Sequence, residues 1–382
     1  MPDVPVEVLD AIQPEVHSIG MRHSVTQRAR AALDRDQKRK AGVLPQSHLI
    51  ARTMDTVTPE ALEWLEPRAG TRIYARGKVT LIGGDPGLGK SLMLTSDEAR
   101  LTAAGHSVVV FSAEDDAHDT MRPRYDVAGA NVERVIHIDG VRHFKDDGSN
   151  ERRAFNLERD TETLRTLLVD HPEVVFVRID PVTAYLGRVD SHKNAEVRAL
   201  LAQLEEIARQ FRVAIVVVTH LNKNNTGPAL YRFVGSLAFV AACRLAFVVA
   251  RDPENADRRL LIPAKANITA DQSGYAFTIE SVHHEGIDQE VARVVWEPEP
   301  VSVTLDGLVQ ADGAHRRHER ERVKAFLQRE LAAGPVASKT LFQKAGTEGI
   351  SERTLFRAKD ELHILARKQF IEWYWAAPDD WK

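Results

Sequence analysis

The sequence predicts an α/β fold in which helices cover a mostly parallel sheet and a smaller helical domain follows. Short runs rich in Val and Ile recur through residues 53–297, and stretches with apolar residues at helical spacing separate them. These runs are nearly continuous in apolar residues, as strands buried on both faces are. Beyond residue 314 the pattern changes to helices followed by an aromatic-rich strand pair, which indicates a second structural unit.

The strands and helices can be assigned in chain order. The expected strands are 79–83, 107–113, 135–139, 173–180, 212–220, 244–251, 258–265 and 275–282, and the expected helices between them are 92–105, 160–171 and 194–211. Ligands of parallel sheets bind at the carboxyl ends of the strands. Gly84, Glu114, Asp180 and His220 all fall at such ends, so they mark a candidate site.

Composition restricts the class of protein. With 382 residues, 43% of them hydrophobic and 28% charged, the chain is long enough for two or three soluble domains. The net charge of −4 gives no global case for nucleic-acid binding. Cys243 is the single cysteine and is expected to be buried. The longest apolar stretch, 237–250, contains Arg244 and is shorter than the ~20 residues of a membrane span. We therefore expect a cytoplasmic protein without a membrane partner.

Four segments are expected along the chain. Residues 1–44 are a basic arm that can be partly disordered, for which a solvated helix and a partner- or DNA-binding extension are alternative interpretations. Residues 45–300 form the sheet domain, 301–314 a linker and 315–382 the second domain.

A glycine-rich loop follows the first strand. Residues 84–91, GDPGLGKS, match the pattern G-x-x-x-x-G-K-[ST] between a strand and a helix. The glycines let backbone N–H groups point at phosphate, and the helix N-terminus adds positive potential. Lys90 would neutralise the β and γ oxygens of ATP, and Ser91 would ligate Mg²⁺. The predicted nucleotide-binding residues are Gly84, Asp85, Pro86, Gly87, Leu88, Gly89, Lys90, Ser91 and Leu92.

The remaining strand ends supply candidates for hydrolysis. Asp180 follows an apolar run and would orient the metal together with Ser91. Pro181 comes next, so a water-activating glutamate cannot occupy that position. We expect the base on the strand next to the P-loop strand, at Glu114, with Asp115 and Asp116 as alternative bases or helix caps. His220 would sense the γ-phosphate and report hydrolysis to the loop that follows it.

This set of motifs resembles the RecA-like core of hexameric helicases, most closely the plasmid and phage RepA-type replicative helicases and related AAA_25 ATPases. The motifs are LIGGDPGLGKS, FSAEDDAHDTMRPRYDVAGA, VFVRIDPVTAYLG, VVVVTHLNKN and YRFVGSLAFVAACRLAFVVARDP. The resemblance implies that Glu114 is the base, His220 the sensor and Arg124 an arginine near the active site. It also implies that a cation acts on the neighbouring subunit's γ-phosphate. Arg232 and Lys265 are the candidates, with Arg244 as an alternative.

A ring of such subunits would have two loops facing its channel. One loop carries Lys193, and the other carries Lys223 and Asn224. Their side chains suit contacts with the backbone of single-stranded DNA, but they would also suit a solvated loop.

The last segment resembles a winged helix-turn-helix. Helices are expected from His315, at 337–346 with Ser338 as the cap, and at 351–363 with Ser351 as the cap, before a wing at 368–375. Arg353 and Arg357 would face outward on the recognition helix. From Arg316 to Lys368 there are thirteen Arg and Lys against seven Asp and Glu, which favours contact with duplex DNA. A protein-docking role is the alternative.

We therefore predict a Mg-ATP-dependent, oligomeric DNA motor, a replicative helicase of plasmid or phage type acting as a hexameric ring. The alternative is a DNA-bound regulatory ATPase, for replication, partition or recombination, that does not unwind DNA. A small-molecule kinase is a third interpretation, although no acceptor pocket is evident in the sequence.

Overall fold

The computed structural model describes residues 30–34, 36–38, 40, 51–145, 148–187, 189, 194–220, 237–369 and 371–378. The chain divides into two compact units, Met1–Ala61 and Leu62–Lys382. The described part of the first unit contains exposed helical residues between 30 and 40 and the short 3-10 helix η1 (Met54–Thr56). Among the described residues, no helix has the length and apolar character needed to cross a membrane.

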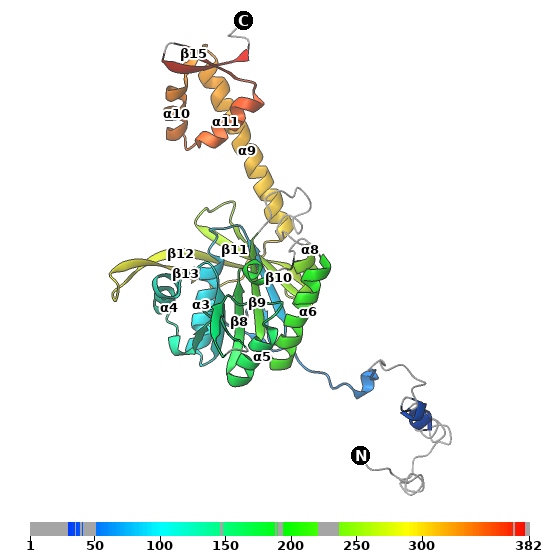
Figure 1. Ribbon diagram of the computed structural model, residues 1–382. Coiled ribbons are helices and arrows are strands. Elements are labelled where there is room, and N and C mark those ends of the chain that lie inside the picture. The colour runs from blue at the N-terminus through cyan, green and yellow to red at the C-terminus, as the bar shows by residue number, and fades with distance from the viewer. Residues whose placement is uncertain are drawn as a thin grey trace. The chain divides into compact units, whose positions relative to one another are not determined.

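A nine-stranded sheet organises the second unit (Figure 1). Its order is β13-β12-β11-β10-β3-β9-β8-β4-β5. The strands from β10 to β5 in this order run parallel, and β11, β12 and β13 are added antiparallel. The expected mostly parallel α/β fold is therefore confirmed. The strands are β3 (Val79–Gly84), β4 (Ser107–Ser112), β5 (Val135–His137), β8 (Val174–Asp180), β9 (Ala214–His220), β10 (Leu245–Arg251), β11 (Arg258–Ala266), β12 (Tyr275–His284) and β13 (Gln289–Trp296).

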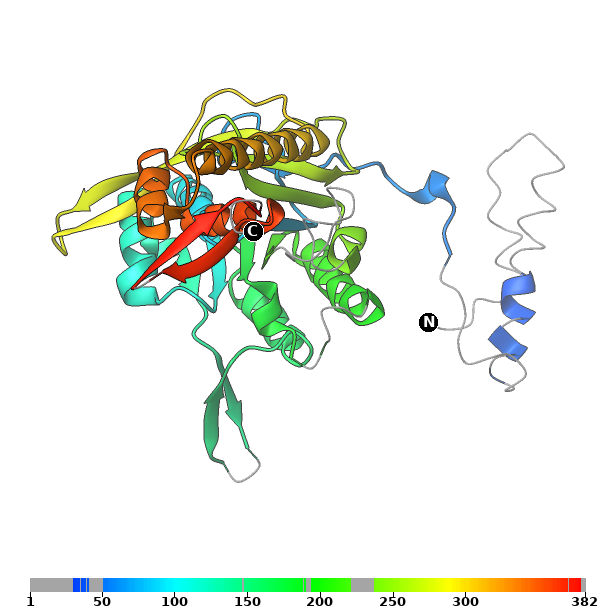
Figure 2. The same ribbon diagram turned by 90° about the horizontal axis from the view of Figure 1, so that it is seen from above.

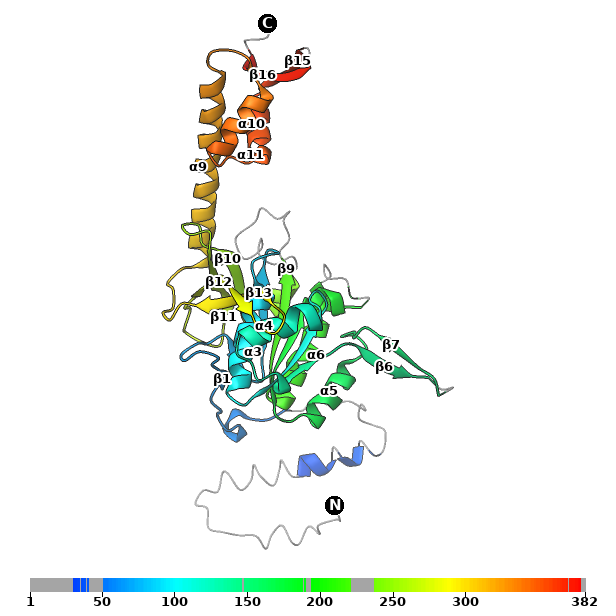
Figure 3. The ribbon, with the colours of Figure 1, turned by 90° about the vertical axis from the view of Figure 1, so that its left-hand side faces the viewer.

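Two apolar clusters explain why the central strands are continuously hydrophobic. Alternate residues of β3 point to opposite faces, so Leu81 packs in one cluster and Ile82 in the other. The first cluster joins the sheet to α5 (Thr161–Asp170), α6 (Asn194–Phe211) and α8 (Leu237–Ala242), and the second joins it to α3 (Lys90–Ala103) and α4 (Arg122–Val127). Figures 1 and 3 show α3 and α6 on opposite sides of the sheet. Cys243 is buried in the first cluster, as expected.

Several smaller elements are not among the expected ones. Between β5 and α5 in the chain, β6 (Val141–Phe144) and β7 (Asn150–Arg153) form a hairpin. This hairpin extends away from the sheet (Figure 2). The short strands β1 (Trp64–Leu65) and β2 (Tyr74–Ala75) pair before the P-loop strand. The π-helix η2 (Ala117–Met121) and the 3-10 helices η3 (Val132–Arg134) and η4 (Val182–Tyr185) connect the larger elements.

The C-terminal segment differs from the expected boundaries. Helix α9 (Leu305–Leu331) begins within the expected linker, because Thr304 caps it by accepting a hydrogen bond from Gly307 N–H at 3.1 Å. Leu305 and Leu308 pack against residues of β10 and β11, so apolar contacts order the segment. Ser338 does not cap α10 (Ser338–Thr347). Ala337 holds the cap position and Ser338 is the first helical residue.

A third helix and three short strands complete the described part of this segment. Helix α11 (Glu352–Glu361) follows α10, and its predicted cap, Ser351, accepts a hydrogen bond from Thr354 N–H. Strands β14 (Val336–Ala337), β15 (Leu365–Gln369) and β16 (Glu372–Ala376) form an antiparallel sheet in the order β14-β16-β15. Leu355 and Ala358 of α11 are buried against α9, whereas Arg353 and Arg357 are exposed.

Candidate nucleotide-binding site

The predicted phosphate loop connects β3 to α3. Strand β3 ends at Gly84, and α3 begins at Lys90. A Cβ atom on Gly84 would lie 2.8 Å from the carbonyl oxygen of Val249, so the neighbouring strand leaves no space for a side chain there. Gly89 precedes α3 with a φ of 81°, a left-handed conformation that favours glycine. The loop therefore has the strand–glycine–helix geometry that presents N–H groups to an anion.

Lys90 is buried inside this loop. Its Nζ donates hydrogen bonds to the carbonyl oxygens of Gly84 and Asp85, both at 2.9 Å, and lies 3.3 Å from Nδ1 of His220. Burial lowers the pKa of Lys90, and the carboxylates of Asp180, Glu114 and Asp85 oppose this effect. The ammonium group is thus held ready for phosphate by acceptors that an ATP oxygen can replace.

His220 connects Lys90 to the predicted base. It pairs with Gly84 in the register of β3 and β9, and its Nε2 lies 3.0 Å from Oε1 of Glu114. An ammonium group can only donate, so Nδ1 of His220 must accept and Nε2 must carry the proton that is donated to Glu114. The structure therefore brings Lys90, His220 and Glu114 into one hydrogen-bonded chain.

The position of Glu114 in the sheet corrects one prediction. Strand β4 is not next to the P-loop strand. β3 lies between β9 and β10, and β4 lies between β8 and β5. Order along the chain is not order in the sheet, because the two later strands, β8 and β9, insert between β3 and β4. Glu114 still reaches His220, since it follows the end of β4 at the same carboxyl edge of the sheet.

The two alternative bases have other partners. Asp115 forms an ion pair with Arg124 at 2.9 Å. Asp116 caps η2 by accepting hydrogen bonds from the backbone N–H groups of His118 and Asp119. Glu114, with a side chain that is 55% exposed, is directed to His220 instead. This arrangement favours Glu114 among the three carboxylates, and Arg124 is paired with the residue that follows the predicted base.

Asp180 and Ser91 fit the predicted metal site. The Asp180 side chain is 4% exposed and lies near the Ser91 side chain, and its Oδ2 has no hydrogen-bond partner among the described residues. Burial raises the pKa of Asp180, and the nearby Arg178 opposes this effect. Hydroxyl and carboxylate oxygens are the donors that Mg²⁺ prefers, and substrate phosphates and water usually complete its coordination. Across the described ranges no group of three or more His, Cys, Asp or Glu could hold a metal.

Among the described residues, the predicted cations Lys265 and Arg244 are not part of this hydrogen-bonded chain. Nζ of Lys265 donates to the carbonyl oxygens of Val240 and Ala241, at 2.9 and 3.1 Å. In this chain Lys265 therefore hydrogen-bonds the C-terminal end of α8. The alternative cation, Arg244, is exposed. Arg232, Lys193, Lys223 and Asn224 lie outside the described residues.

Sequence reasoning missed two contacts of the phosphate loop. Ile279 of β12 lies against Gly89, where an added Cβ would come within 2.7 Å of Cδ1 of Ile279. Arg178 of β8 donates a hydrogen bond to the carbonyl oxygen of Ser91 at 3.0 Å. The second contact had a signal, because Arg178 is a charged residue inside an apolar run. The first had none, since Ile279 lies far from Gly89 along the chain.

A phosphate loop at the centre of a mostly parallel sheet, with Asp180, His220 and Glu114 at the same edge, defines a RecA-like P-loop ATPase core. Within that class, residues 38–226 match the AAA domain family AAA_25.

Curated relatives share part of this core. The chain is 31% identical over 161 residues to the DNA repair protein RadA of Listeria monocytogenes, which covers 40% of this chain and 30% of the relative. It is 28% identical over 181 residues to RadA of Bacillus subtilis, which covers 43% of this chain and 35% of the relative. The chain thus spans about a third of the length of these relatives.

Solved structures with some similarity include a DnaB-like replicative helicase, with 13% identity and a TM-score of 0.43 over 54% of this chain and 57% of that one. The RadB recombinase matches with 15% identity and a TM-score of 0.40 over 54% of this chain and 89% of that one.

Proposed function

We propose that this protein is a Mg-ATP-dependent, oligomeric DNA motor, and specifically a replicative DNA helicase of plasmid or phage type. The observation that carries the proposal is the hydrogen-bonded chain from Lys90 through His220 to Glu114. It connects the residue that binds phosphate to the predicted base through a residue that can respond to both. A site that only binds nucleotide has no need of this connection.

The proposed chemistry assigns a role to each side chain. Lys90 exchanges its bonds to the loop carbonyls and His220 for bonds to ATP oxygens. Glu114 then accepts a proton from a water molecule in line with the γ-phosphate. Ser91 and Asp180 would hold Mg²⁺, which supplies neutralisation of phosphate charge when bound. Because His220 contacts both ends, a change at the γ-phosphate would alter its contacts and the start of the loop that follows β9.

DNA as the partner is supported by two observations. The curated relatives are named DNA repair proteins. The C-terminal segment contains helices α9, α10 and α11 and the antiparallel strands β14, β15 and β16, which supports the proposal of a winged helix, and Arg353 and Arg357 are exposed on α11. Exposed arginines on a helix in this position suit the phosphates and major groove of duplex DNA. We therefore propose that residues 315–382 bind duplex DNA, while Lys193, Lys223 and Asn224 contact single-stranded DNA.

Assembly into a ring belongs to the same proposal. A cation from a neighbouring subunit would stabilise the charge on the transferred phosphoryl group, as arginine fingers do. Arg232 is the first candidate. Lys265 would have to leave the α8 carbonyls to act, and Arg244 is the exposed alternative. A site completed in this way would require a head-to-tail assembly, either a ring or a filament, and we propose a hexameric ring.

Strand displacement tests the helicase proposal against its alternative. The substrate is a forked DNA duplex with a fluorescent strand, and the proteins are the wild-type chain and Lys90→Ala as the nucleotide-binding control. We expect ATP-dependent displacement by the wild type and none by the variant. Binding to the fork with ATP hydrolysis but without displacement would reject the helicase and favour a DNA-bound regulatory ATPase.

A further inference from the structure

Strand β8 contains a buried cation that the proposed reaction does not use. Arg178 is 1% exposed and lies two residues before Asp180. Because strand side chains alternate, Arg178 and Asp180 share the sheet face that α3 covers. A fully buried arginine is costly unless its charge and its N–H groups are satisfied, so its partners indicate what it does.

Those partners lie along one face of α3. Nη1 of Arg178 donates to the carbonyl oxygen of Ser91 at 3.0 Å and to Oγ1 of Thr95 at 3.3 Å. Its Nε lies 3.3 Å from Oε1 of Glu98, as an ion pair without hydrogen-bond alignment. Positions 91, 95 and 98 follow one another at helical spacing. The guanidinium group thus spans the first two turns of the helix that begins at the phosphate loop.

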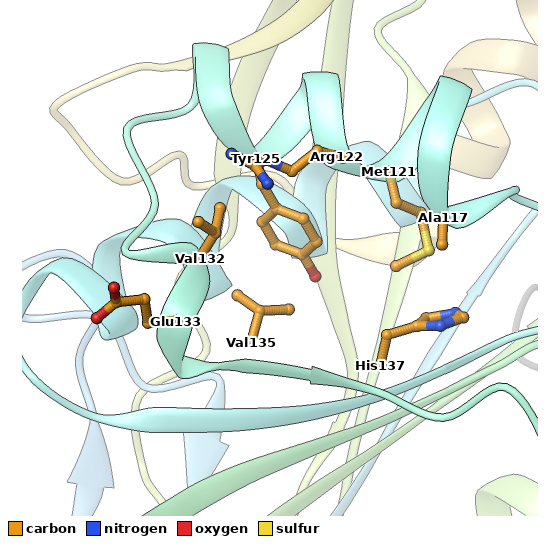
Figure 4. A pocket seen from close by; sticks show the side chains of 8 residues that line it. All are labelled: Ala117, Met121, Arg122, Tyr125, Val132, Glu133, Val135 and His137. Carbon is orange, nitrogen blue, oxygen red and sulfur yellow. The ribbon is translucent and has the colours of Figure 1, made fainter.

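The far end of this network reaches α4. The Tyr125 hydroxyl donates to Oε2 of Glu98 at 2.5 Å. Figure 4 shows Tyr125 reaching down from α4, with its ring between Met121 and Val132 and above Val135. Burial raises the pKa of Glu98 to about 7, and Arg178 and Tyr125 oppose this effect. The buried polar groups therefore connect the P-loop helix, the strand that carries Asp180 and the helix that carries Arg124.

A buried ion pair of this kind is a poor source of stability. Replacing such a pair with apolar residues is often neutral or stabilising, whereas removing only one partner is strongly destabilising. Packing alone therefore gives no reason for Arg178 in the run VVFVRID. Its hydrogen bond to the Ser91 carbonyl oxygen gives a functional reason, because the Ser91 side chain lies near Asp180.

We propose that Arg178 is a positioning residue for the Mg²⁺-nucleotide site, holding the Ser91 backbone so that the Ser91 hydroxyl and the first turn of α3 stay aligned with Asp180. This inference rests on the proposed nucleotide site. Without the contact, the first turn keeps its helical bonds but loses the anchor to β8. Coordination that uses Ser91 and Asp180 together then weakens more than the binding of nucleotide alone.

Two variants separate this role from a role in folding. Arg178→Lys keeps a positive charge beside Glu98, but its single ammonium group cannot bond Ser91, Thr95 and Glu98 together as the fork of arginine does. Arg178→Met with Glu98→Gln removes both buried charges, and the new glutamine can still accept from Tyr125. Arg209→Lys is the matched control, because it changes an exposed Arg–Glu pair on α6.

The measurement is the binding of a fluorescent ATP analogue (mant-ATP) to the full chain, in Mg²⁺ and in EDTA, together with the thermal unfolding temperature. We expect the gain in affinity from Mg²⁺ to be about tenfold smaller in both Arg178 variants, about 1.4 kcal/mol. Binding in EDTA should be nearly unchanged, and Arg209→Lys should behave as the wild type. A full Mg²⁺ gain in either folded variant, or failure of both variants to fold, would overturn the proposal. If the wild type bound no nucleotide, the proposed function itself would fall.

Discussion

The contact between Gly89 and Ile279 gives a prediction with a calculable size. Replacing Gly89 with Ala has two costs. A φ of 81° places Ala in the left-handed region, at about 1–2 kcal/mol. The new Cβ would lie 2.7 Å from Cδ1 of Ile279, and overpacking of this kind costs about 1–3 kcal/mol. We expect Gly89→Ala to lower the free energy of unfolding by about 2–5 kcal/mol, the sum of these two ranges.

A second substitution separates these costs. Ile279→Val removes Cδ1 and alone should cost about 0.5–1.5 kcal/mol. In the Gly89→Ala background it should relieve the overpacking, so the double variant should be more stable than the two single costs predict, by about 1–3 kcal/mol. Urea unfolding of the wild type, both single variants and the double variant measures this coupling. Ile287→Val, at an exposed position between β12 and β13, is the control and should show none.

Additive costs would refute the reasoning. If the double variant lost the sum of the single losses within about 0.5 kcal/mol, Ile279 would not restrict the space at Gly89. The inferred contact between β12 and the phosphate loop would then be refuted.

Three further predictions concern other parts of the sheet domain. Arg153 bonds both Asp160 oxygens at 2.6 Å; burial raises the pKa of Asp160, but Arg153 and the Asn156 N–H bring the net shift below the ordinary value. Asp160→Asn should therefore cost about 2 kcal/mol of unfolding free energy at neutral pH. That deficit should vanish as the pH falls below the ordinary Asp pKa and through the lowered folded-state pKa, and an equal deficit in acid would contradict the assignment. Burial raises the pKa of the Cys243 thiol to about 12, so iodoacetamide should label Cys243 only in denaturant, and rapid labelling of the native chain by mass spectrometry would count against its burial. His220→Ala should slow steady-state phosphate release by about 10²-fold with little change in mant-ATP affinity, whereas an unchanged rate would remove His220 from the mechanism.

Local patterns predicted most of the fold. Each apolar run expected as a strand forms one, from β3 to β12. The central strands β3, β4, β8, β9 and β10 are buried along almost their whole length, which is why they are so strongly apolar. The phosphate loop could also be predicted from the sequence, since its glycines and Lys90 lie within one short segment. Strand β13 was not predicted, although its residues VARVVW have strand character. Considering an antiparallel hairpin partner for β12 would have indicated this strand.

Spatial neighbours could not be predicted in the same way. The order of strands in the sheet depends on which strands insert between others, so the sequence did not show that β8 and β9 separate β4 from β3. The contact of Ile279 with Gly89 depends on the path of β12, which no local pattern encodes. Arg178 was different, because one charge inside an apolar strand indicates a buried partner, here Glu98.

The rate of phosphate release with and without single-stranded DNA tests the central claim most directly. The proteins are the wild type, Glu114→Gln and, as a control, Asp116→Asn, whose side chain caps η2. We predict that DNA stimulates the wild type and that Glu114→Gln loses about 10²–10⁴-fold in rate while still binding ATP, with Asp116→Asn retaining activity. An unchanged rate in Glu114→Gln, or a wild-type rate that is indifferent to DNA, would contradict the claim that Lys90, His220 and Glu114 form the ATP site of a DNA motor.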